Sequence, residues 1–206
     1  MVRILIAVPT YENIMPDTFK SIYDLDKCGH ECIFEFMRGY DCAKARNTIA
    51  QRALNLQADY VLMLDNDMTL PTDALKNLLD EDKDVCFGYC ARRIPGNEYD
   101  GVTCVYKNDG EFCYSHMFPA RDLKTIRESG INKIQVHGCG AGCVLIKTDV
   151  FRCLPFPWFK WITYENREEL SEDLFFCELC NQHGIPLYVD TRVSCGHLFR
   201  DFVYTE

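Results

Sequence analysis

Runs of consecutive apolar residues alternate along the chain with segments whose apolar residues recur every three or four positions. The first pattern is typical of strands buried on both faces, and the second of amphipathic helices. The apolar runs predict strands at 3–10, 32–38, 59–67 and 84–92, and the periodic segments predict helices at 17–25, 41–55 and 71–82. This order predicts an α/β fold: one doubly wound, mostly parallel (mixed) sheet flanked by helices.

The pattern changes after residue 92. Asn108-Asp109-Gly110 is a turn signal between two apolar stretches, so it predicts a small antiparallel hairpin over 101–118. Segment 133–151 then predicts a strand, a glycine-rich turn, a second strand and a short helix. A helix over 171–184, with Ser171 as its N-cap, and a last strand over 186–195 complete the prediction. The stretch 155–170 is irregular and the most aromatic.

Length, charge and cysteine content narrow the class of protein. The 206 residues predict a single domain over 1–206, and no apolar run is long enough for a transmembrane helix. The net charge of −9 gives no strong nucleic-acid signal, because such proteins usually carry a basic surface. Thirteen cysteines without a secretory signal predict reduced, mostly buried thiols and a cytoplasmic location.

Two carboxylates follow the strand predicted at 59–67. Alternation along a strand would point Asp65 and Asp67 to the same face, at the carboxyl end of a central parallel strand, where open α/β sheets bind ligands. A hard divalent cation, Mg²⁺ or Mn²⁺, would balance two such carboxylates and complete its shell with substrate phosphates. The alternative is a polar turn with a helix-capping aspartate.

Further polar groups are expected at the same edge of the sheet. Residues Pro9, Thr10, Tyr11 and Glu12 follow the first strand, where they could hold a base and ribose or form an ordinary turn. Arg46, with Arg38 as a second candidate, would suit a diphosphate, because guanidinium groups bind such anions well.

Five segments, in order, resemble the family-2-type glycosyltransferases with the GT-A fold. They are VPTYEN (8–13), AKARNTIAQRAL (43–54), VLMLDNDMTLP (61–71), GCGAGCVLIKTDVF (138–151) and SEDLFFCELCNQHGIPLYVDTRVSCGHL (171–198). Each segment is weak by itself, and their order makes the resemblance specific. Segment 93–132 departs from the family by being short and irregular, so the donor-sugar pocket is poorly specified.

The resemblance implies a metal-dependent, inverting glycosyltransferase that moves a sugar from a nucleoside-diphosphate donor, with UDP-sugar favoured, to an acceptor hydroxyl. It implies His197 as a third metal ligand beside Asp65 and Asp67. It also implies Asp173 as the general base and Glu172 as a residue that orients the donor sugar. Asp65 and Asn66 would contact the nucleotide, and Gly140 belongs to the segment that lines the sugar.

On this interpretation residues 1–92 form the nucleotide-binding half and residues 93–206 the acceptor and sugar half. The acceptor is open between a glycan, a lipid-linked sugar and a protein, and a large acceptor would call for a partner or a homo-oligomer. The aromatic stretch 155–170 is an acceptor platform, a lid or ordinary packing. Two rival functions are a nucleotidyltransferase of similar architecture and a non-catalytic nucleotide- or metal-binding module.

Overall fold

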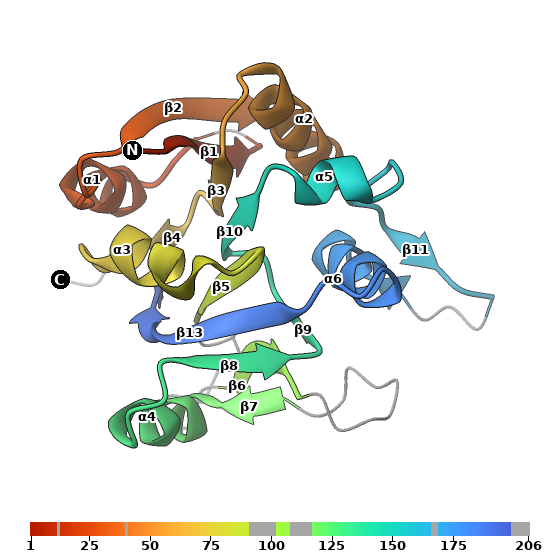
Figure 1. The fold of residues 1–206 in the computed structure, drawn as a ribbon. Coiled ribbons are helices and arrows are strands. Elements are labelled where there is room, and N and C mark those ends of the chain that lie inside the picture. Colours follow the sequence, from red (N-terminus) through yellow and green to blue (C-terminus); the bar gives the residue numbers. More distant parts are fainter. Residues whose placement is uncertain (12, 40, 91–101, 108–116, 166–168, 199–206) are drawn as a thin grey trace, which may run out of the picture.

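One mixed sheet of seven strands forms the centre of the protein (Figure 1), in the order β2-β1-β3-β10-β5-β13-β8. The computed structural model describes residues 1–11, 13–39, 41–90, 102–107, 117–165 and 169–198. The strands of this sheet are β1 (Arg3–Thr10), β2 (Glu31–Arg38), β3 (Tyr60–Leu64), β5 (Val85–Tyr89), β8 (Lys133–Val136), β10 (Cys143–Lys147) and β13 (Leu187–Ser194).

Strand direction in this sheet agrees with the predicted fold class. β1 is parallel to β2 and β3, and β13 is parallel to β5, whereas β10 and β8 run antiparallel to their neighbours. The prediction of a mostly parallel, mixed α/β sheet is therefore confirmed.

Helices cover both faces of the sheet. They are α1 (Pro16–Asp24), α2 (Cys42–Asn55), α3 (Ala74–Leu79), α4 (Ala120–Glu128), α5 (Val150–Cys153) and α6 (Glu172–Gln182), with a 3₁₀ turn at Asp80–Asp82. Figure 1 shows α1 and α3 on one side and α2, α5 and α6 on the other. Alternation along β1 supplies both cores: Leu5 packs in the cluster that contains Ile49 of α2, and Ile6 in the cluster that contains Ile22 of α1.

Three smaller sheets lie beside the main one. They pair β4 (Met68–Thr69) with β14 (Gly196–His197), β11 (Ile162–Thr163) with β12 (Glu169–Leu170), and β6 (Val102–Tyr106) with both β7 (Met117–Pro119) and β9 (Gly138–Cys139). The antiparallel β6–β7 pair matches the predicted hairpin. Its expected turn at 108–110 lies outside the described residues.

Segment 93–132 is less irregular than predicted, because α4 occupies Ala120–Glu128. This helix buries only Leu123 among its residues. Its only large apolar residues are Leu123 and Ile126, set among charged ones, so the segment contains no extended apolar pattern.

A buried ion pair joins the last two strands of the sheet. Lys133 of β8 lies 2.9 Å from Asp190 of β13, and their side chains are 2% and 0% exposed. Arg192 extends this pair outward, since it also contacts Asp80 at 3.1 Å. These contacts join β13 and β8 to each other and to Asp80, at the edge of the sheet opposite β2.

Two properties of the described residues bear on the sequence predictions. No helix among them is long and apolar enough to cross a membrane. None of their cysteines forms a disulfide.

Candidate active site

A cavity of about 270 Å³ opens where β1 and β3 end. Its lining is formed by Pro9, Thr10, Tyr11, Gly39, Cys42, Ala45, Asp65, Asn66 and Asp67. The structure therefore brings together six of the residues predicted to hold nucleotide or metal. Arg38 is the last residue of β2 and pairs with Thr10, so it lies next to this group. Glu12 is outside the described residues.

Asp65 and Asp67 lie in a turn after β3, and not in the strand that the sequence predicted. β3 ends at Leu64, and residues Asp65 to Asp67 form a turn in which the amide of Met68 donates to the carbonyl of Asp65 at 3.2 Å. Strand alternation therefore does not set their directions, and that expectation was wrong. The turn is held from the other side by Asn66, whose amide donates to the carbonyl of Asn13 at 2.6 Å.

His197 reaches Asp67 through a short antiparallel pair. His197 of β14 pairs with Met68 of β4, and the amide of Leu198 donates to the carbonyl of Asp67 at 2.8 Å. The imidazole Nε2 then lies 3.9 Å from the carboxylate Oδ1 of Asp67. Gly196 lies against the Thr69 side chain, since a Cβ at its position would come within 2.4 Å of the Thr69 hydroxyl, which would have to rotate away.

Asp67 and His197 fit a divalent cation as a pair. Carboxylate oxygen and imidazole nitrogen are both ligands of Mn²⁺, and imidazole favours Mn²⁺ over Mg²⁺. Two ligands at about 2.1 Å from one ion lie ~3 Å apart at neighbouring positions, so binding requires a contraction of ~1 Å. In the part of the chain that the structure describes, no three His, Cys, Asp or Glu side chains already form a metal cluster. The three-ligand set with Asp65 stays a prediction.

Arg46 connects three parts of the site from the buried face of α2. Its guanidinium donates to the Asp65 carboxylate at 2.7 Å, to Glu172 at 3.3 Å and to the carbonyl of Ala141 at 3.0 Å. The side chain is only 2% exposed, and all three of its nitrogens contact protein oxygens. Arg46 was predicted to contact a diphosphate, and that contact stays a prediction. The visible contacts instead position two carboxylates.

Burial and charge act on Asp65 in opposite directions. Packing around its carboxylate raises the pKa of Asp65, and the neighbouring Arg46 limits the rise. Asp67 and Asp173 add to the rise through repulsion. A cation near Asp67 would relieve this repulsion, so the site is electrostatically prepared for positive charge.

Glu172 and Asp173, although adjacent on α6, have different surroundings. Glu172 is 5% exposed and faces Arg46, whereas Asp173 is half-buried. One oxygen of Asp173 accepts from the amide of Ala141 at 3.2 Å, and the other from the Ser171 hydroxyl. Ser171 is the N-cap residue, as predicted, but its side chain bonds Asp173 rather than the helix backbone.

Gly140 lies between β9 and β10, close to Asp173. A side chain at this position would come within 2.9 Å of Cys104 and 3.5 Å of the Asp173 carboxylate. The structure thus gives Gly140 a packing role beside the predicted base. Its expected contact with the donor sugar stays a prediction.

Cys42 is a lining residue that the sequence interpretation missed. Packing raises the pKa of its thiol to about 12, against the opposing effect of Arg46, and Glu172 adds to the rise. Its position at the start of α2, one turn before Arg46, was the signal that could have indicated it.

Comparison with solved structures identifies the fold. GalNAc-T7, crystallised with UDP, GalNAc and Mn²⁺, superimposes with a TM-score of 0.63 and 12% identity over 97% of this chain and 44% of that chain. TarS of S. aureus, in complex with UDP-GlcNAc, superimposes with a TM-score of 0.51 and 13% identity over 99% of this chain and 61% of that chain. A197 from STIV superimposes with a TM-score of 0.63 and 19% identity over 97% of this chain and 87% of that chain.

These similarities define the class to which the fold belongs. The chain has the GT-A-type glycosyltransferase fold, as the sequence motifs predicted. It spans about half to three fifths of the lengths of GalNAc-T7 and TarS. No protein-family profile matches this sequence, and no curated protein matches it.

Proposed function

We propose that this protein is a metal-dependent, inverting glycosyltransferase that uses a nucleoside-diphosphate sugar, with UDP-sugar favoured. The observation that carries the proposal is the approach of His197 to within 3.9 Å of Asp67, a residue that lines the same cavity as the residues at the end of β1. Several solved structures with the same fold contain UDP or a UDP-sugar, and some also contain Mn²⁺. This supports a UDP-sugar donor and a divalent metal for this protein.

Different residues of the site would carry out different parts of the reaction. Asp67 and His197 hold the cation, which when bound stabilises the negative charge on the departing diphosphate. Pro9, Thr10 and Tyr11 face the base and ribose. Asp173 takes the proton of the acceptor hydroxyl. The hydroxyl oxygen of the acceptor then bonds to the anomeric carbon of the donor sugar as the bond from that carbon to the diphosphate breaks.

The two halves of the chain would serve this chemistry unequally. Residues 1–92 supply the nucleotide side of the cavity. Residues 93–206 supply Asp173 and also His197, so the metal site takes one ligand from each half. Cysteines without disulfides in the described residues are compatible with the proposed cytoplasmic location.

The test is calorimetric titration of UDP and GDP, with and without Mn²⁺, into the wild type and Asp67→Ala. We expect Mn²⁺-dependent binding of UDP that is lost in Asp67→Ala and kept in Asp149→Ala. Asp149 is a matched control, because it lies at the start of α5 and is 87% exposed. Failure of both nucleotides to bind the wild type would contradict the proposal and favour a different kind of binding module.

Product analysis separates transfer of a sugar from transfer of a nucleotide. A glycosyltransferase releases nucleoside diphosphate from its donor, whereas a nucleotidyltransferase releases pyrophosphate. Release of pyrophosphate would replace the proposed reaction with the rival one.

A further inference from the structure

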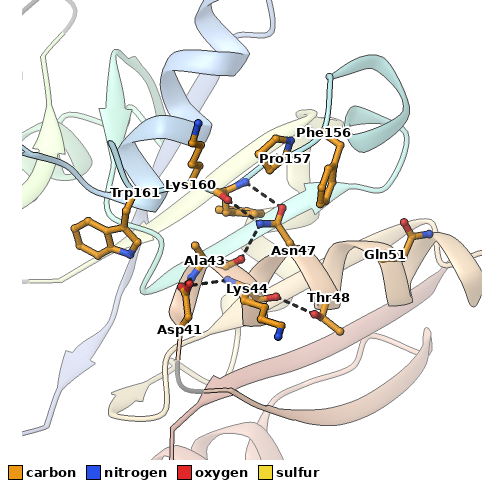
Figure 2. A pocket seen from close by; sticks show the side chains of 11 residues that line it. Asp41, Ala43, Lys44, Asn47, Thr48, Gln51, Phe156, Pro157, Lys160 and Trp161 are labelled. Atoms are coloured by element: carbon orange, nitrogen blue, oxygen red, sulfur yellow. Dashed lines mark hydrogen bonds between the residues drawn. The ribbon is translucent and has the colours of Figure 1, made fainter. Parts of the chain in front are cut away.

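A second, larger cavity of about 690 Å³ lies on the other side of the first turns of α2 (Figure 2). Its lining comes from Asp41, Ala43, Lys44, Asn47, Thr48 and Gln51 of the α2 region and from Phe156, Pro157, Phe159, Lys160 and Trp161 of the aromatic stretch. This volume is within the range of small-molecule sites, which are usually few in one protein. The proposed metal and nucleotide residues do not line it.

Asn47 holds the two walls of this cavity together. Its side-chain oxygen accepts from the amides of Trp158 at 3.0 Å and Phe159 at 3.2 Å. Its side-chain nitrogen donates to the carbonyls of Phe159 at 2.7 Å and Ala43 at 2.9 Å. Four hydrogen bonds from one amide fix the aromatic stretch on α2, so the cavity is preorganised in the free protein.

The aromatic stretch serves two purposes. Trp158 and Phe159 are 5% and 1% exposed and pack in the core with Phe151. Phe156 and Trp161, in contrast, are 69% and 51% exposed, although large aromatic side chains usually gain from burial. Figure 2 shows Trp161 and Phe156 at opposite ends of the cavity, with α2 side chains between them. Buried rings therefore anchor the loop and exposed rings face solvent at its edges.

The polar groups between the rings indicate what could bind there. Asp41 caps α2 with one carboxylate oxygen. The Thr48 hydroxyl donates to the carbonyl of Lys44 at 2.8 Å and the Gln51 amide nitrogen to Asn55 at 3.2 Å, so the oxygens of both side chains keep the capacity to accept hydrogen bonds. Figure 2 shows the ammonium ends of Lys44 and Lys160 directed away from each other, so they do not clamp a phosphate. Flat apolar rings with hydrogen-bonding groups between them suit a sugar, which has apolar C–H faces and a rim of hydroxyls.

A short ladder connects this cavity to the proposed base. Ile162 of β11 pairs with Leu170 of β12. Trp161 immediately precedes the first of these residues, and Ser171 immediately follows the second. The Ser171 hydroxyl donates to the Asp173 carboxylate. A sugar stacked on Trp161 would therefore lie at the entrance to the general base.

We propose that this cavity is the acceptor site and that the acceptor is a carbohydrate chain, with one sugar unit stacked on Trp161 and a more distant one on Phe156. The proposal rests on the proposed function. It narrows the acceptor from glycan, lipid-linked sugar or protein to a ligand recognised through two or more sugar units.

The test measures binding of free oligosaccharides by ligand-observed NMR. The probes are di- to tetrasaccharides of glucose, galactose, mannose, N-acetylglucosamine and xylose, titrated into the wild type, Trp161→Ala, Phe156→Ala and Tyr23→Ala. Tyr23 is the matched control, because it is an aromatic residue 74% exposed on α1, on the opposite face of the sheet. Both substituted rings are exposed, so the variants are expected to fold.

We expect the wild type to bind at least one probe, with tenfold or greater loss of affinity in Trp161→Ala, a smaller loss in Phe156→Ala and no loss in Tyr23→Ala. No binding of any probe, or binding that is unchanged in both cavity variants, would overturn the inference. Calorimetry with UDP and Mn²⁺ on the same samples separates the two proposals. If the protein binds UDP but its oligosaccharide binding does not depend on Trp161 or Phe156, only the acceptor site is contradicted. If the protein does not bind UDP, the proposed function is contradicted.

Discussion

Arg46 and Glu172, which are 126 positions apart in the chain, form a buried ion pair with Nε and Oε1 separated by 3.3 Å. The same guanidinium holds Asp65 at 2.7 Å. One cation thus contacts both the first carboxylate of the D-x-D turn, Asp65-Asn66-Asp67, and Glu172 at the start of α6. Through these contacts and its bond to the carbonyl of Ala141, Arg46 links the proposed metal side to the segment whose Ala141 amide donates to the proposed base, Asp173.

Replacement of Arg46 is expected to cost both stability and nucleotide binding. Arg46→Met leaves the buried Glu172 without its cation and also removes the partner of Asp65, which is one third exposed; loss of the partner of a buried charge typically costs about 3–5 kcal/mol. Burial already raises the pKa of Asp65 and Arg46 limits that rise, so without Arg46 its folded-state pKa lies further above the unfolded value, and stability falls as pH rises through that interval. Urea unfolding at pH 4 and pH 8 checks this: the deficit relative to the wild type should be small at pH 4 and large at pH 8. An equal deficit at both pH values would contradict it.

The Lys133–Asp190 pair provides a control for the effect of losing a buried ion pair. Lys133→Met removes one of the two cationic partners of Asp190, which is 0% exposed and keeps its contact with Arg192 at 2.6 Å, so we expect a stability loss below the about 3–5 kcal/mol typical of an unpaired buried charge. The pair lies at the edge of the sheet remote from the D-x-D turn, so UDP affinity in the presence of Mn²⁺ should not change. If Lys133→Met weakened UDP binding as much as Arg46→Met does, the positioning role of Arg46 would be unsupported.

Asp173→Asn should abolish transfer and spare donor binding. The amide keeps an oxygen that can accept from Ala141, but it cannot take a proton from an acceptor, so the rate should fall by roughly 10²–10⁴-fold. Turnover is measured as UDP released in the presence of acceptor, and UDP affinity by calorimetry. Ser171→Ala should lose less, since it removes only a hydrogen bond to the base. Full activity in Asp173→Asn would remove Asp173 from the mechanism.

His197→Ala should weaken Mn²⁺-dependent UDP binding without unfolding the protein. The imidazole is one quarter exposed, and the β4–β14 pair is made by backbone groups that alanine retains. His197→Gln, which offers a neutral oxygen or nitrogen, is expected to recover part of the affinity. UDP binding that is unaffected in both variants would leave Asp67 as a metal ligand without His197.

Cys42 should resist alkylation, although it lies at the surface of the nucleotide cavity. With a pKa of about 12, its thiolate fraction near pH 8 is ~1000-fold below that of an ordinary cysteine. Iodoacetamide labelling followed by peptide mass spectrometry should show slow modification whose rate increases about tenfold per pH unit up to pH 10. A rate that levels off by pH 9 would mean that the thiol ionises normally.

The sequence predicted those parts of the fold that depend on buried apolar runs. The strands around Leu62 and Phe87 are buried throughout, and the strand around Leu5 at every residue after Arg3, so their runs are unambiguous. α4 was missed because it buries only Leu123. The turn at Asp65–Asp67 was mistaken for strand because both conformations bring the two carboxylates together.

Long-range contacts at the site were beyond a local reading of the sequence. Residue types indicated a cation partner for the carboxylates, but nothing near Arg46 in the chain shows that it binds Asp65 and Glu172 rather than a phosphate. The His197–Asp67 pair likewise depends on two-residue strands, which are too short to leave a hydrophobic period. The large cavity arises from two segments about 110 positions apart that Asn47 joins.

The β4–β14 pair has a consequence for the order in which the site is assembled during synthesis. Asp65 and Asp67 leave the ribosome long before Asp173 and His197 do. A nascent chain that has already formed β1, β2 and β3 therefore displays the D-x-D turn without its imidazole partner and without the base. On the proposed function, metal affinity and catalysis would be acquired late and together, and an incomplete chain would not consume nucleotide sugar.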